Sequence, residues 1–206
     1  DVAPSRGLGD VYKRQAFTTS TGYGIAKYDN PEELSVSDRN NIGYQYTDCP
    51  LYWISVIYLN FAEAKAEMGS LTQDDLNNSI NKLQARAGLP AMTTTPDADP
   101  ANNMGVSNLI WEIRRCRRCE LIMDNWYRYW DLIRWHQLDK LDSTKYPNTM
   151  LGANVSNVPD CEEATKNGYI DASDAQIRTY EAKHYFYPIP TTQLTLNKNM
   201  KQNPGW

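Results

Sequence analysis

Between Ser107 and Trp135, apolar residues recur every three or four positions, which predicts helix with one buried stripe. Ser107 is the expected N-cap, and Asn125 tolerates the left-handed backbone geometry that breaks a helix. We therefore predict two helical pieces, over about 108–124 and 126–137, around which the rest of the chain is organised. The predicted buried stripe consists of Leu109, Ile113, Cys116, Cys119, Ile122, Met123, Trp126, Tyr129, Trp130 and Ile133.

Two further helices are predicted upstream, over 51–68 and 76–87, from apolar positions spaced in threes and fours. Gly69 supplies a stop for the first helix, and Thr72 with Asp75 forms a capping box for the second. Two antiparallel helices joined by a tight turn are the unit of tetratricopeptide-like arrays. The predicted fold class is therefore mostly α, with tetratricopeptide-like helix pairs, long loops and minor short strands.

The remaining segments are predicted to be largely irregular. Residues 138–184 lack periodicity, with one short strand expected at 184–187, and long irregular regions often carry function. Pro188 and Pro190 fix the backbone and remove hydrogen-bond donors, so the tail is expected to run extended. Residues 1–15 fit no pattern in the chain and are interpreted as extraneous read-through sequence.

Composition narrows the function classes. The chain has 206 residues and a net charge of -4, which argues against nucleic acid as a partner. Its 14 Tyr and 6 Trp against 3 Phe favour rings that pack on one side and hydrogen-bond on the other, as sugar-binding surfaces do. A thin core with long loops would have the same composition. The sequence contains no run of about eighteen apolar residues, which is the length that a helix needs to span a membrane.

Few residues suggest catalysis. Two histidines leave little room for a catalytic triad, and the sequence has no nucleophile elbow, phosphate-binding glycine loop or metal motif. The acid pairs Asp171 with Asp174 and Glu162 with Glu163 are interpreted as solvated loop residues. Cys116 and Cys119 are interpreted as small buried residues and not as a redox or zinc pair. We therefore expect a non-enzymatic protein without a cofactor or metal.

Charged and aromatic side chains in the central helices have two interpretations each. The arginines at 114, 115, 117 and 118 could bind an anion, but neighbouring acids favour a structural ion-pair network, as between Asp131 and Arg134. Aromatic residues at helical spacing are predicted to be core, namely Trp126, Tyr127, Tyr129 and Trp130. Rings in loops are better ligand candidates because loops present side chains to solvent, and these are Tyr23, Tyr28, Tyr44 and Tyr46.

Three sequence blocks, in this order, resemble the SusD/RagB family. They are Leu59 to Ala64 with Asn81 to Pro90, then Arg117 to Trp135, then Tyr187 to Pro190 with the terminal Gln-Asn-Pro-Gly-Trp. The matching motif residues, for which a structural role is expected, are Asn60, Glu63, Arg86, Gly88, Arg117, Arg118, Glu120, Arg128, Asp131, Arg134, Trp135, Pro188, Pro190 and Asn203. The chain departs from the family pattern at Trp53, Gln84 and Cys116, where relatives usually carry charged residues.

The resemblance implies a lipid-anchored, surface-exposed protein of the Bacteroidetes outer membrane. Such a protein binds oligosaccharide or polysaccharide, or in some relatives a peptide, without catalysis and delivers it to a TonB-dependent SusC-like transporter. Residues 16–206 would be its C-terminal region, ending at the true C-terminus. The lipid anchor and most of the glycan platform would lie upstream, so this region would supply scaffold and transporter contact more than ligand contact. The helix pairs alone would equally permit a helical-repeat protein–protein interaction module without a glycan ligand.

Overall fold

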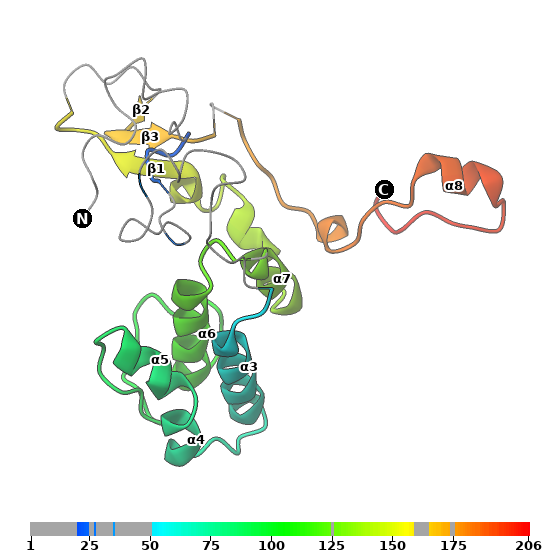
Figure 1. The fold of residues 1–206 in the computed structure, drawn as a ribbon. Helices are drawn as coiled ribbons and strands as arrows, with labels where there is room; N and C mark the ends of the chain where they lie inside the picture. The colour runs from blue at the N-terminus through cyan, green and yellow to red at the C-terminus, as the bar shows by residue number, and fades with distance from the viewer. Residues whose placement is uncertain are drawn as a thin grey trace. The chain divides into compact units, whose positions relative to one another are not determined.

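The computed structural model describes residues 20–24, 27, 35, 51–124, 126–158, 165–173 and 176–206. The chain divides into two compact units, one of residues Pro50–Gln137 and one of Asp1–Cys49 with Leu138–Trp206. Over the described ranges the elements are six α-helices, three short 3-10 helices and one three-stranded sheet (Figure 1). The mostly helical fold with minor strands is therefore confirmed.

The unit Pro50–Gln137 is helical. It contains α3 (Ile54–Glu67), α4 (Gln73–Asn77), α5 (Ile80–Arg86), α6 (Asn108–Glu120) and α7 (Tyr127–Arg134). The helix α3 packs against both α5 and α6, and α4 packs against α5. One apolar core lies between them, formed by Val56, Leu59, Ala62, Leu76, Ile80, Leu83, Met92, Ile113 and Leu121.

The predicted helix signals at the ends of these helices are present. In the capping box of α4, Thr72 N donates to Asp75 Oδ2 at 2.9 Å and Asp75 N donates to Thr72 Oγ1 at 3.1 Å. The Thr72 hydrogen bonds lower the pKa of Asp75 to about 2. Gly69 and Gly88 follow α3 and α5 with φ of 66° and 68°, a region that favours glycine. Ser107 caps α6, accepting a hydrogen bond from Ile110 N at 3.3 Å.

The predicted single helix over 76–87 is wrong, because the chain breaks between α4 and α5. Ser79 Oγ donates to Asp75 O at 2.6 Å, and the Ser79 backbone lies outside the helical region. A serine that bonds the carbonyl four residues back competes with the helical ladder. The buried Ser79 therefore separates two short helices where the apolar spacing alone indicated one.

The predicted buried stripe holds from Leu109 to Cys116, where Ile113 is fully buried and Leu109 and Cys116 are partly buried against the core. Beyond it Cys119, Ile122 and Met123 are exposed, and the tryptophans at 126 and 130 are exposed as well. Met123 and Trp126 have φ of 63° and 58°, so the backbone turns between α6 and α7 and a single periodicity does not continue across the break. The buried positions are instead Arg117, Leu121, Asp124, Asp131, Leu132 and Trp135.

The second unit contains a sheet that the irregular pattern of 138–184 did not predict. The strands β1 (Leu151–Asn154), β3 (Tyr169–Asp171) and β2 (Thr165–Lys166) pair antiparallel in the order β1-β3-β2. Asn167 and Gly168 connect β2 to β3 with φ of 55° and 80°. Two consecutive positive φ values are typical of a tight hairpin turn.

Three 3-10 helices lie before and after the strands in the sequence: η1 (Leu138–Leu141), η2 (Pro147–Met150) and η3 (Ala182–Tyr185). The strand predicted at 184–187 is wrong, since η3 covers its first half. Glu181 N donates to His184 Nδ1 at 3.0 Å, and this local bond favours a turn over an extended strand.

The C-terminal tail contains α8 (Thr191–Leu196) and then folds back on the preceding segment. The Gln202 side chain accepts from Ile189 N at 2.8 Å and donates to Ile189 O at 3.0 Å. Asn203 Nδ2 donates to Tyr187 O at 2.7 Å, and Trp206 Nε1 donates to Phe186 O at 2.9 Å. The expected extended tail is thus interrupted by one short helix and closed by side-chain bonds to the backbone.

Several sequence predictions lie outside the described residues. These concern residues 1–15, Tyr28, Tyr44, Tyr46, Asn125, Glu162, Glu163 and Asp174. Within the described ranges, no helix combines the length and the apolar composition needed to cross a membrane.

The two sides of α3 give a first test. Leu59 is fully buried, and Leu59→Ala is expected to lower the free energy of unfolding by about 2–5 kcal/mol because it leaves a cavity. Ile57→Ala, on the exposed side of the same helix, is expected to change it by less than about 0.5 kcal/mol. Chemical denaturation followed by circular dichroism measures both, and equal losses would contradict this orientation of α3.

Candidate functional site

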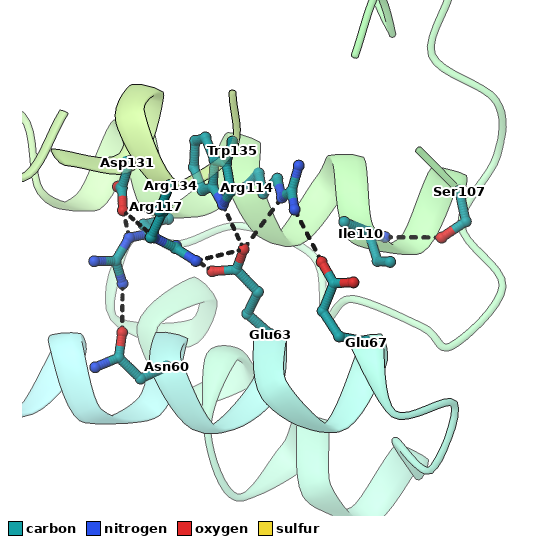
Figure 2. Close-up of polar contacts among 10 residues, drawn as sticks. All are labelled: Asn60, Glu63, Glu67, Ser107, Ile110, Arg114, Arg117, Asp131, Arg134 and Trp135. Atoms are coloured by element: carbon teal, nitrogen blue, oxygen red, sulfur yellow. Dashed lines mark hydrogen bonds and ion pairs between the residues drawn. The ribbon is translucent and has the colours of Figure 1, made fainter. Parts of the chain in front are cut away.

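A network of charged side chains lies between α3, α6 and α7 (Figure 2). Glu63 of α3 is at its centre, where it accepts hydrogen bonds from Trp135 Nε1 at 2.7 Å and Arg114 Nε at 3.1 Å. Arg134 donates to both carboxylate oxygens of Glu63. Arg114 also reaches Glu67, one turn further along α3, at 2.9 Å. One buried carboxylate of α3 therefore binds side chains of α6, of α7 and of the residue that follows α7.

The second half of the network is centred on Arg117, which is only 4% exposed. Its Nε donates to Asp131 Oδ2 at 2.7 Å and its Nη1 donates to Asn60 Oδ1 at 2.8 Å. Asp131 Oδ1 also accepts from Arg134 Nε at 2.9 Å, which joins this half to Glu63. Hydrogen bonds between side chains thus connect α3, α6 and α7 with one another (Figure 2).

The electrostatics favour a charged carboxylate at Glu63. Burial alone would raise its pKa, but the hydrogen bond and charge of Arg134, with Trp135 and Arg114, hold the pKa below its usual value of 4.5. Burial lowers the pKa of Arg134, yet Glu63 and Asp131 raise it overall. The guanidinium groups of Arg114 and Arg134 each lie 4.7 Å from the centroid of the Trp135 ring, a cation–π distance.

These contacts determine what the network can do chemically. Both oxygens of Glu63 and of Asp131 already accept hydrogen bonds from arginine or tryptophan. A carboxylate engaged in this way is poorly placed to exchange a proton with a substrate or to bind a metal. Among the described residues, no three His, Cys, Asp or Glu side chains gather as metal ligands. The network is therefore suited to holding helices in place.

The ion pairs differ in part from those expected along the sequence. The pair of Asp131 with Arg134 is confirmed. Arg117 bonds Asp131 of α7 and not an acid of its own helix, and Glu120 pairs with Arg86 of α5 at 2.6 Å. Sequence spacing shows neighbours on one helix but carries no signal for a partner on another.

Two tryptophans predicted to be core are instead exposed at the start of α7. Trp126 is 80% exposed and Trp130 is 53% exposed. Trp130 N donates to Trp126 O at 3.2 Å, so the two residues lie on successive turns. Tyr129 packs edge-on against Trp130, with ring centroids 5.5 Å apart. Because Asp131 and Arg134 hold α7 in the network, this tryptophan pair has a fixed position on the unit.

Of the loop tyrosines proposed as ligand contacts, Tyr23 is the one that the structure describes. It is exposed and lies beside β1, where Thr21 O accepts from Ala153 N at 2.8 Å. Gly22 sits against Ala153 and Ile170, with no room for a side chain. Tyr23 therefore belongs to the sheet unit, and the network belongs to the helical unit.

The other motif residues and the two cysteines differ in how far they are buried. Arg128 is half-buried on α7, where burial and the nearby charge of Arg118 lower its pKa. Arg118 itself is exposed. Burial raises the pKa of the Cys116 thiol to about 12, whereas Cys119 is exposed, so the expectation that both cysteines are buried is wrong.

Comparison with known proteins identifies the family. The family model described as SusD family matches residues 2–206. The chain belongs to the SusD family. A crystal structure of a SusD-like protein from Bacteroides fragilis is similar to this chain, with a TM-score of 0.51 and 25% sequence identity. The similarity covers 74% of this chain and 25% of that protein, so this SusD-family chain spans about a quarter of its relative's length. No curated protein matches the chain.

Removing one charged partner from the network of this SusD-family chain is expected to lower the free energy of unfolding most where the ion pair is buried. Arg117→Leu leaves Asp131 as a buried charge without its main partner, and we expect a loss of about 3–5 kcal/mol in the free energy of unfolding. Arg86→Leu removes a partner from the more exposed pair with Glu120 and should cost less than about 1 kcal/mol. Urea denaturation compares the two variants, and similar losses would contradict a network stabilised by burial.

The lowered pKa of Glu63 predicts a pH dependence. Its contribution to stability is fully present above the unfolded pKa, near 4.5, and is lost as the pH falls through the lower folded pKa. The stability difference between the wild type and Glu63→Gln should therefore be largest near neutral pH and shrink in acid. Denaturation series at several pH values measure it. A difference that stays constant into acid would mean that the Glu63 charge does not stabilise the fold.

Proposed function

We propose that this chain is part of a cell-surface protein that binds an oligosaccharide without catalysis and delivers it to a SusC-like TonB-dependent transporter. Membership in the SusD family supports this proposal. The observation that carries it is the pair of exposed tryptophans, Trp126 and Trp130, on a helix held by the buried network.

Physical reasons connect this geometry to sugars. The C–H faces of sugar rings are apolar and pack against flat aromatic side chains, while their hydroxyl groups stay hydrated. Binding costs least entropy when the aromatic groups are already ordered. Asp131 directly follows Trp130 and is bonded to Arg117 of α6, and Arg134, one turn beyond Trp130, is bonded to Glu63 of α3, so α7 needs little further ordering. The pair therefore suits non-catalytic capture of a glycan, so this region would add a ligand contact to the scaffold role that the family resemblance implies.

The other parts of the proposal rest on the family. A lipid anchor, a position on the outer membrane and docking to the transporter belong to the whole protein, of which residues 16–206 would be the C-terminal region. Residues 1–15 stay a predicted read-through segment. Tyr23, Tyr28, Tyr44 and Tyr46 stay candidates for additional ligand contacts, with Tyr23 exposed as such a contact requires.

Replacing both rings tests the proposal. The double variant Trp126→Ala with Trp130→Ala is expected to weaken oligosaccharide binding at least about tenfold, because it removes the apolar surface on which a sugar ring would stack. Tyr52→Ala is the matched control, since Tyr52 is an 83% exposed aromatic residue of the same unit. Isothermal titration calorimetry against a panel of neutral and acidic oligosaccharides measures the affinity.

Two results would contradict the proposal. One is a double variant that binds the panel as tightly as the wild type. The other is an equal loss in Tyr52→Ala, which would mean that any exposed ring contributes and that the position on α7 does not matter.

A further inference from the structure

A positively charged side chain follows the tryptophan pair along α7. Trp130 and Arg134 are four residues apart, so their side chains lie on one face of the helix, and Trp126 lies one turn before Trp130. All three side chains reach solvent, with exposed fractions of 80% for Trp126, 53% for Trp130 and 44% for the Arg134 side chain. We call these three residues the α7 row. A ligand that extends along both rings would therefore reach a guanidinium group.

Arg134 has hydrogen-bond donors beyond those that the network uses. A guanidinium group carries five N–H bonds. Nε of Arg134 donates to Asp131, and Nη1 and Nη2 each donate to one oxygen of Glu63 (Figure 2). Arg134 makes no other hydrogen bond within the described ranges, so one N–H bond on each of Nη1 and Nη2 remains. Because the side chain is partly exposed, an acceptor on a ligand has access to these donors.

Two further arginines near the α7 row lack a carboxylate partner. Arg118 is exposed near the end of α6, and Arg128 is half-buried between the two tryptophans in the sequence. Neither forms an ion pair with any residue that the structure describes. Burial and then the charge of Arg118 lower the pKa of Arg128, and Asp131 offsets this only in part. Buried cations are normally paired, so this surface has positive charge that an anionic ligand would neutralise.

We propose that the ligand of the tryptophan pair is an acidic oligosaccharide built from uronic acids, whose rings stack on Trp126 and Trp130 and whose carboxylate accepts hydrogen bonds from Arg134. This inference rests on the proposed function, because it assigns the chemical class of the ligand at the same site. A carboxylate bonds a guanidinium group more strongly than a neutral hydroxyl does. One helical turn rises about 5.4 Å, which is close to the length of one hexose unit in an extended chain.

Matched pairs of ligands test the proposal on the full 206-residue chain. Oligogalacturonate, oligomannuronate and hyaluronan oligosaccharides are each compared with their own methyl esters, which keep the sugar rings and lose the charge. In isothermal titration calorimetry, the wild type is expected to bind at least one acid form at least about tenfold more tightly than its ester, because the ester cannot form the charge-assisted hydrogen bond. Added salt should reduce this preference.

Two variants locate the charge that produces the preference. Arg134→Lys keeps a positive charge beside Glu63 but lacks the planar guanidinium group, so most of the preference for the acid form should disappear. Arg118→Glu reverses an exposed charge outside the network and should reduce the preference at least about threefold. Arg178→Glu is the matched control, because it reverses an exposed charge in the other unit and should leave the preference unchanged. Circular dichroism confirms the fold of each variant.

The outcomes separate this proposal from the proposed function. Equal binding of the acid forms and their esters by the wild type would overturn the assignment of an acidic ligand and leave glycan binding in place. A preference that both Arg134→Lys and Arg118→Glu retain in full would also overturn it, since the carboxylate would then bind elsewhere. If acidic, esterified and neutral oligosaccharides all fail to bind, the proposed function itself is wrong, and this inference is wrong with it.

Discussion

The hydrogen-bonded ion network between α3, α6 and α7, built on the buried Glu63, Arg117 and Asp131, is the constraint on which the helical unit depends. Removing charges from water costs several kcal/mol per ion, so a buried pair is tolerated only where hydrogen bonds satisfy it. Here Glu63 accepts hydrogen bonds from three side chains, and Arg117 donates to both Asp131 and Asn60. Because guanidinium groups bond in fixed planar directions, these contacts determine orientation as well as proximity. The network therefore fixes how three helices meet.

This constraint also explains the turn between α6 and α7. Met123 and Trp126 adopt left-handed backbone conformations, each of which costs about 1–3 kcal/mol for a residue with a side chain. Such conformations persist where the surroundings determine them, and here the ends of the turn are bonded through Arg117 and Asp131. The consequence for function is that Trp126 and Trp130 stay in solvent, on a helix that cannot easily turn them inward.

Local sequence signals predict much of the fold, whereas the contacts between helices cannot be predicted from such signals. The capping box at Thr72, the Ser107 cap and the glycine stops depend on a few neighbouring residues, so the sequence shows them directly. The break at Ser79 and the buried position of Arg117 depend on partners that periodicity does not encode. The hairpin at Asn167-Gly168 did have a sequence signal, since this dipeptide favours two positive φ values, but flanking strands of two and three residues show no alternation. At the candidate site, the sequence indicates the motif residues, but its helical spacing places the two exposed tryptophans in the core.

The network holds α7, and with it the tryptophan pair, in place. Amide hydrogen exchange along α7, compared between the wild type and Arg117→Leu, measures this most directly. We expect the amides of α7 and of its C-cap residue, such as Trp135 N, which donates to Asp131 O at 2.9 Å, to exchange at least about a hundredfold faster in the variant. Amides of α5, which is outside the network, should change less. Unchanged protection of α7 in Arg117→Leu would mean that the network does not hold this helix in place.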